Sequence, residues 1–182
     1  GTSNIAIMVF DHTGTSHSSY SSRVKCLTFT AGNNYQSIYA SRDTDELDPL
    51  SPPTSGSYPP SYKKYKNQIK LTFVPSGNED PEQPIDPELP IDPEQPADLT
   101  TVEIGEDKEP FAANNFHLPV YDFAQYALSQ QIYTEEDFED NLGAIHSVSF
   151  KLGNQRDAVV RQYEVYMKHT DLDVFEGAYV TM

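Results

Sequence analysis

The hydrophobic residues of the chain fall into short runs separated by turns, and most of these runs have the spacing of β-strands. Residues 4–10 (NIAIMVF) are apolar on both faces, which is typical of a strand at the centre of a sheet. Residues 68–74 alternate between apolar and polar positions, which predicts a strand with one buried face. The pattern predicts further strands at 23–30, 35–41, 101–105, 126–133, 144–152 and 158–168, an extended segment at 114–123, and a long polar loop at 42–66.

One short helix interrupts this series of strands. Thr134 is a suitable helix cap, and the three acidic residues that follow it suit the positive end of a helix dipole. The turn residues 141–143 (NLG) limit this helix to about two turns. The sequence therefore predicts an all-β fold, a β-sandwich of jelly-roll or immunoglobulin-like type with one short helix.

A proline-rich segment divides the strands into two groups. A unit of six residues, Pro-Glu-x-Pro-(Ile/Ala)-Asp, occurs three times, at 81–86, 87–92 and 93–98. Proline fixes φ and lacks an amide donor, so this segment is incompatible with a helix or a central strand. We expect residues 79–98, called the spacer below, to be an extended rod, in which the eighteen repeat residues 81–98 span roughly 55 Å at about 3.1 Å per residue. It separates strands of one sandwich half (1–78) from strands of another (99–182).

Charge is distributed unevenly along the chain, whose net charge is −16. Residues 1–78 contain seven basic and five acidic side chains, the spacer contains eight acidic and no basic ones, and residues 99–182 contain fifteen acidic and five basic ones. Such a negative field repels polyanions, which argues against nucleic acid as a partner. No apolar run approaches 18 residues, so we expect no membrane span and no signal peptide in these 182 residues.

Two groups of segments resemble a known repeat module. Residues 126–152 (YALSQQIYTEEDFEDNLGAIHSVSFKL) and 162–175 (QYEVYMKHTDLDVF) resemble the first half of a β-sandwich repeat found in tandem in secreted surface proteins of Bacteroidetes-type bacteria. Residues 4–19 (NIAIMVFDHTGTSHSS), 33–41 (NNYQSIYAS) and 66–73 (KNQIKLTF) resemble its second half. The resemblance implies an extracellular or cell-surface location and a role in adhesion, binding or spacing.

The order of the two halves differs from that of the family. The resemblance implies that the first half comes before the second within one module, whereas this chain has the second half first. The chain thus resembles the end of one repeat, a spacer and the start of the next, and about two strands of the module are missing. Because neither half can bury its apolar faces alone, we expect the halves to pair, within one chain or between chains as a strand-exchanged homo-oligomer. The missing strands would leave open sheet edges that favour association.

Residues with catalytic or metal-binding chemistry show no recognisable pattern. Asp11, His12 and Ser16 are too close in sequence to converge as a catalytic triad and are expected to form a polar turn. The acidic clusters lack the alternating spacing of a calcium loop, and Cys26, the only cysteine, is expected to be a buried apolar residue without a disulfide. We therefore expect no enzyme activity, no cofactor and no metal. The residues considered for a metal site were His117, His146, His169, Glu135, Glu136, Asp137, Glu139, Asp140, Asp171 and Asp173.

Tyrosines are the remaining candidates for ligand contact. Exposed tyrosines stack on sugar rings or anchor protein partners, whereas buried ones fill the core of a sandwich. The sequence leaves both roles open, and the ligand would be a protein, a glycan or a neighbouring repeat. A carbohydrate-binding accessory module is the alternative function that these residues support. The candidates are Tyr58, Tyr62, Tyr65, Tyr121, Tyr126 and Tyr133.

Overall fold

The computed structural model describes residues 4–16, 25–54, 60–75, 99–106, 118–119, 121–138, 143–153 and 161–182. The strands are β1 (Asn4–Asp11), β2 (Thr28–Thr30), β3 (Ser37–Arg42), β4 (Ser61–Lys63), β5 (Tyr65–Asn67), β6 (Ile69–Pro75), β7 (Thr100–Ile104), β8 (Tyr126–Tyr133), β9 (Gly143–Phe150) and β10 (Tyr163–Thr170). They form a five-stranded sheet in the order β10-β1-β8-β3-β4, a three-stranded sheet in the order β7-β6-β9, and the pair β2-β5. The predicted all-β sandwich is confirmed.

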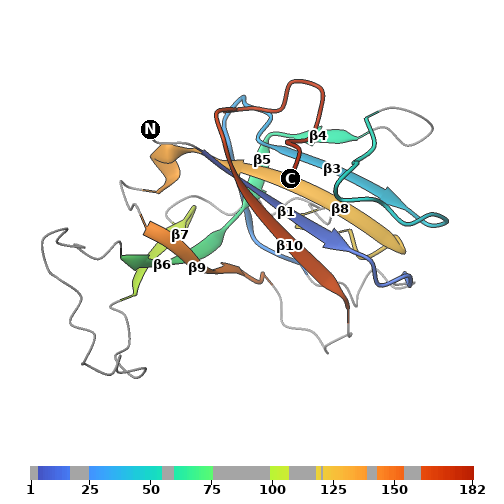
Figure 1. Ribbon diagram of the computed structural model, residues 1–182, viewed down its shortest axis with the longest axis horizontal. Coiled ribbons are helices and arrows are strands. Elements are labelled where there is room, and N and C mark those ends of the chain that lie inside the picture. Colours follow the sequence, from blue (N-terminus) through green and yellow to red (C-terminus); the bar gives the residue numbers. More distant parts are fainter. Residues whose placement is uncertain are drawn as a thin grey trace, which may run out of the picture.

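The two sides of the spacer contribute to the same sheets (Figure 1). In the five-stranded sheet, β1, β3 and β4 precede the spacer, whereas β8 and β10 follow it. Strand β1 lies between β8 and β10 and is antiparallel to both. In the three-stranded sheet, β6 from before the spacer pairs with β7 and β9 from after it. The two halves of the sandwich therefore come from either side of the spacer and pair within one chain; the spacer itself lies outside the described residues.

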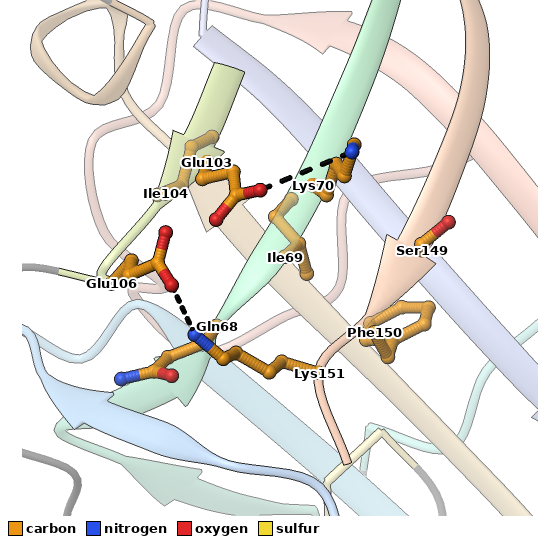
Figure 2. A pocket seen from close by; sticks show the side chains of 9 residues that line it. All are labelled: Gln68, Ile69, Lys70, Glu103, Ile104, Glu106, Ser149, Phe150 and Lys151. Atoms are coloured by element: carbon orange, nitrogen blue, oxygen red, sulfur yellow. Dashed lines mark hydrogen bonds and ion pairs between the residues drawn. The ribbon is translucent and has the colours of Figure 1, made fainter. Parts of the chain in front are cut away.

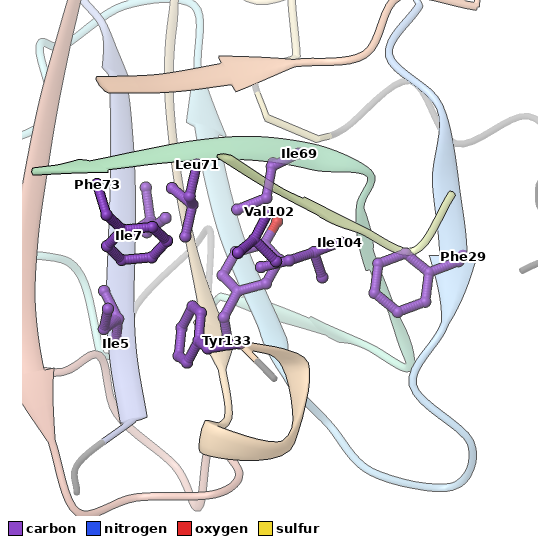
Figure 3. Close-up of a cluster of buried hydrophobic side chains, with 10 residues drawn as sticks. Ile5, Ile7, Phe29, Ile69, Leu71, Phe73, Val102, Ile104 and Tyr133 are labelled. Carbon is purple, nitrogen blue, oxygen red and sulfur yellow. The ribbon is translucent and has the colours of Figure 1, made fainter. Parts of the chain in front are cut away.

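The main core lies between the five-stranded and three-stranded sheets (Figure 3). Side chains from β1, β6, β7 and β8 converge there, together with Phe29 of β2 and Phe138. Most of these side chains are less than 5 % exposed. Removing this much apolar surface from water is the dominant favourable contribution to folding. The buried residues of this core are Ile5, Ile7, Phe29, Ile69, Leu71, Phe73, Val102, Ile104, Tyr133 and Phe138.

A second apolar cluster covers the opposite face of the five-stranded sheet. Met8 and Phe10 of β1 contribute to it, together with Phe175 and Tyr179 from the last residues of the chain. Both faces of β1 are consequently buried, and every residue from Asn4 to Asp11 is less than 9 % exposed. The apolar pattern of residues 4–10 predicted this central position correctly.

A buried polar pair fixes the position of β5 against β8. The backbone N–H of Asn67 donates to Gln131 Oε1 at 2.6 Å, and Gln131 Nε2 donates to Asn67 Oδ1 at 2.7 Å. The hydroxyl of Tyr133 donates to the carbonyl oxygen of Asn67 at 3.0 Å. These bonds satisfy polar groups that would otherwise be costly to bury.

Three local predictions were wrong or only partly right. The polar loop predicted at 42–66 contains β4 and part of β5, which are three residues long and rich in lysine and tyrosine. The strand predicted at 23–30 pairs regularly only over Thr28–Thr30, with an isolated bridge between Cys26 and Leu152. The helix after Thr134 is a single 3₁₀ turn, Glu135–Asp137.

Gly105 ends β7 in a conformation that a side chain would disturb. Its φ is +80°, which L-residues with a Cβ rarely adopt. A Cβ added at Gly105 would lie 2.3 Å from Cδ1 of Phe29, within the core. The glycine therefore allows the backbone to pass directly over the Phe29 ring.

Candidate functional site

The predicted tyrosine contacts are spread over several parts of the fold. Tyr58 lies outside the described residues. Tyr133 is fully buried and belongs to the main core. Tyr62 and Tyr126 are partly buried against the second apolar cluster. Among the described candidates, Tyr133 therefore lies on one face of the five-stranded sheet, and Tyr62 and Tyr126 lie on the other.

Two of the remaining tyrosines are partly buried beside other groups. Tyr121 stacks on Phe123, with ring centroids 6.0 Å apart. Burial raises the pKa of Tyr65 above its ordinary value, with a smaller contribution from Tyr39. Tyr121 therefore packs against Phe123, and Tyr65 is partly buried near Tyr39.

Tyr35, which sequence reasoning missed, is more accessible and lies beside the predicted candidate Tyr62. Tyr35 is 46 % exposed and meets the Tyr62 ring edge-on, with centroids 6.0 Å apart. The ammonium group of Lys64 lies 5.1 Å from the centroid of the Tyr35 ring. The sequence predicts Tyr35 as the first residue of a strand at 35–41, whereas β3 begins at Ser37 and leaves Tyr35 outside the strand.

Asp11 and His12, two of the three residues weighed for a triad, interact with other side chains of the fold. The carboxylate of Asp11 is fully buried and accepts from Arg161, with Nε 2.7 Å and Nη2 2.5 Å from Oδ2. Its other oxygen accepts from the backbone N–H of Thr13 at 3.0 Å. The ring nitrogens of His12 instead face Glu46 at 4.0 Å and Glu164 at 3.7 Å. The contacts of Asp11 close the turn after β1.

Lys66 is the most unusual ionisable group in the described part of the chain. Its side chain is 3 % exposed, and its ammonium group donates to Gln36 Oε1 at 2.9 Å, to the carbonyl of Ile132 at 3.5 Å and to Asp137 Oδ2 at 2.5 Å. Burial lowers the pKa of Lys66, and the charge of Asp137 opposes this shift. Because all three ammonium protons are used, the geometry indicates a structural cation rather than a nucleophile.

A pocket at the end of the three-stranded sheet is lined by paired charges (Figure 2). Its volume is about 300 Å³. Lys70 lies 3.9 Å from Glu103, and Lys151 lies 2.6 Å from Glu106. A hydrogen bond between the two carboxyl groups raises the pKa of Glu103 and lowers that of Glu106. The charges of the pocket largely neutralise one another.

An open apolar edge lies between β10 and β9. Two cavities separate the strands, one of about 260 Å³ that includes Val148 and Val165, and one of about 190 Å³ that includes Ile145 and Met167. Among the described residues, four of the eight large hydrophobic side chains that are exposed belong to this edge: Leu152 (59 %), Tyr163 (47 %), Val165 (44 %) and Met167 (44 %). We call these four residues and the two cavities the open edge. Such a surface is suited to binding.

Cys26 lines the larger cavity of the open edge. Burial, together with the nearby charge of Asp122, raises the pKa of its thiol to about 12. The thiol is therefore protonated at neutral pH and has little nucleophilic character. The expectation of a buried residue is only partly right, because Cys26 has an intermediate exposure.

The described residues contain no group of three or more histidine, cysteine, aspartate or glutamate side chains arranged to hold a metal ion. Within the same residues, no helix has the length and apolar character needed to cross a membrane. The His146 and His169 side chains lie on separate strands, and His117 is outside the described part.

Comparisons with known proteins do not identify a family for this chain. No family model, no curated protein and no solved structure matches it. The resemblance to a Bacteroidetes-type repeat thus remains a hypothesis that rests on the sequence segments given above.

Proposed function

We propose that this chain is a non-catalytic β-sandwich repeat that serves as an adhesion, binding or spacer module of an extracellular bacterial surface protein. The observation that supports this proposal most directly is the open edge, an accessible apolar surface of the sandwich. Two of the buried charged groups are engaged in ion pairs within the fold, Asp11 with Arg161 and Lys66 with Asp137. The sequence resemblance supplies the extracellular setting.

The surface location is tested with antibodies raised against the purified chain. Labelling of intact cells of the source bacterium is expected, with an antibody against a cytosolic enzyme as the control for intact membranes. Labelling that appears only after lysis would reject the extracellular part of the proposal.

The binding role is tested with beads that carry the chain on a mucin-coated surface, which presents both protein and glycan. We expect the beads to be retained, and we expect Val165→Ser/Met167→Ser to reduce retention because it removes apolar area from the open edge. Leu50→Ser, which changes an exposed leucine elsewhere, is the matched control. Equal retention of bare and coated beads would argue against adhesion to such surfaces.

A carbohydrate-binding module is the second candidate, favoured by the exposed Tyr35 ring beside Tyr62 and Lys64. Exposed aromatic faces stack on sugar rings. A glycan array is expected to give binding that Tyr35→Ala abolishes, while Tyr163→Ala, a tyrosine of similar exposure on β10, leaves it unchanged. An array without any binding sugar would remove this candidate.

A further inference from the structure

Strand β10 is an edge strand that is eight residues long. It pairs with β1 on one side, and no strand in the described part of the chain pairs with its other side. Six of its residues are exposed and the other two are partly buried. An edge of this length presents backbone donors and acceptors that favour addition of another strand.

The side chains of β10 alternate between two environments. Tyr163, Val165 and Met167 lie opposite Asp11, Val9 and Ile7 of β1 and so share the face that points toward the open edge. Glu164, Tyr166 and Lys168 lie on the other face, where Tyr166 packs against the second apolar cluster.

The sequence of β10 is complementary to itself when read in the opposite direction about Tyr166. If β10 of a second chain pairs antiparallel with β10 so that the two Tyr166 residues are opposite, Glu164 of each chain lies opposite Lys168 of the other, and Val165 lies opposite Met167. The two-fold axis makes each of these pairs occur twice. Tyr163 then lies opposite His169, and the two Tyr166 residues face each other. Opposite charges and apolar pairs at directly opposing positions both stabilise a sheet.

We propose that two copies of this chain associate through β10, antiparallel about a two-fold axis at Tyr166, so that the two five-stranded sheets become continuous. The chain has a net charge of −16, which disfavours general self-association and makes local charge pairing decisive. Residues that face the open edge would extend its apolar surface across the dimer. This inference goes beyond the proposed function and does not depend on it.

The proposal is tested by sedimentation velocity over a range of concentrations with charge-reversed variants. Lys168→Glu places glutamates opposite each other at two symmetric positions, and Glu164→Lys does the same with lysines. Each single variant is expected to weaken the dimer about tenfold or more. The double variant Glu164→Lys/Lys168→Glu, and an equimolar mixture of the two single variants, are expected to restore it because both recreate opposite-charge pairs.

Lys63→Glu is the matched control, since it makes the same change of charge on β4, the opposite edge of the same sheet. It is expected to leave the dimer unchanged. Three outcomes would overturn the proposal. The chain could stay monomeric at all concentrations, or Lys63→Glu could weaken the dimer while the two β10 reversals do not. The dimer could also be insensitive to both reversals on β10, as a strand-exchanged dimer would be.

The register is tested by oxidative cross-linking in a Cys26→Ala background. Tyr166→Cys places two thiols across the axis, where Cβ atoms of opposing residues are about 5 Å apart, and should form a disulfide-linked dimer. Lys168→Cys places its thiols about four residues apart along the strand, on the order of 14 Å, and should not. Cross-linking of Lys168→Cys in preference to Tyr166→Cys would overturn this register.

Discussion

Replacing Asp137 with alanine is expected to lower the free energy of unfolding by about 3–5 kcal/mol, because it leaves the buried ammonium group of Lys66 without its countercharge. The side chain of Lys66 is 3 % exposed, whereas that of Asp137 is 17 % exposed. The two ends of the pair are therefore not equivalent. Without Asp137, the remaining acceptors for Lys66 are the neutral oxygens of Gln36 and Ile132, at 2.9 and 3.5 Å.

Replacing Lys66 with methionine should have a much smaller effect, about 1 kcal/mol or less in either direction. Methionine keeps most of the volume between the rings of Phe29 and Tyr133, which lie 5.5 and 5.2 Å from the ammonium group. The carboxylate of Asp137 reaches water and still accepts from the backbone N–H of Thr134 at 2.7 Å. Removing a buried charge costs less than leaving one unpaired.

The double variant Lys66→Met/Asp137→Ala separates the ion pair from helix capping. The difference in the free energy of unfolding between this double variant and Lys66→Met reports only the hydrogen bonds of Asp137 to Thr134, about 1 kcal/mol. Urea unfolding followed by the circular dichroism of the tyrosines supplies all four free energies, since the chain has no tryptophan. Equal losses for the two single variants would refute the reasoning.

The pH dependence of Asp137→Ala provides a second measurement. Burial lowers the pKa of Lys66 in the folded state, so the folded chain binds this proton less readily than the unfolded chain does. The contribution of Lys66 to the free energy of unfolding therefore rises with pH between the pKa of Lys66 in the folded state and its unfolded value of about 10.5. This gain is absent below the folded-state pKa. Asp137 opposes the shift, so its removal should lower the folded-state pKa of Lys66 further and extend the rise in stability to lower pH, whereas Lys66→Met should abolish the rise.

Three further outcomes are expected. Asp11→Ala should cost about 3–5 kcal/mol in urea unfolding because it strands the buried guanidinium of Arg161, and adding Arg161→Met should recover most of the loss. Gly105→Ala should destabilise the chain more than Gly32→Ala, since both have positive φ but only the former also overlaps a core ring; equal losses in thermal unfolding would contradict this. The thiol of Cys26, with its pKa raised to about 12, should react with a disulfide reagent at least about a hundredfold more slowly in the folded chain than in urea.

The long strands could be predicted because each carries its own periodic signal. Residues 126–133 were predicted as a strand and form β8 with the same bounds. The three-residue strands β4 and β5 were not recognised, because three residues show no period and their lysines favoured a loop. Strands this short are determined by the edges they join rather than by their own sequence.

The burial of Lys66 could not be read from its neighbours. Its partners Gln36 and Asp137 lie 30 and 71 positions away, so only the sheet topology brings the three together. The same holds for the tyrosines, whose roles depend on which face of a sheet is covered. The strand predicted at 158–168 includes Val165 and Met167, but only the structure shows that both side chains are exposed.

The spacer joins two strands that are direct neighbours. Phe73 of β6 pairs with Thr100 of β7, and Cα atoms of paired residues in antiparallel strands lie about 4.5–5.5 Å apart. A reach of roughly 55 Å is therefore not needed to connect the halves of the sandwich. The connection between β6 and β7 is topologically that of a hairpin, which a short turn can close.

Replacing residues 76–98 with Asn-Gly should therefore preserve the fold. Shortening the connection from 26 residues to about five lowers the entropy cost of loop closure by roughly 1.5 kcal/mol, so unfolding should require the same urea concentration or a higher one. A chain of unchanged length with a scrambled spacer is the control for composition. The spacer contributes to folding if the shortened chain loses the β-sheet signal in circular dichroism or unfolds at a clearly lower urea concentration. If neither change occurs, the prolines and carboxylates of the spacer are not needed for the sandwich. Their role would then lie outside it, as expected for a surface module.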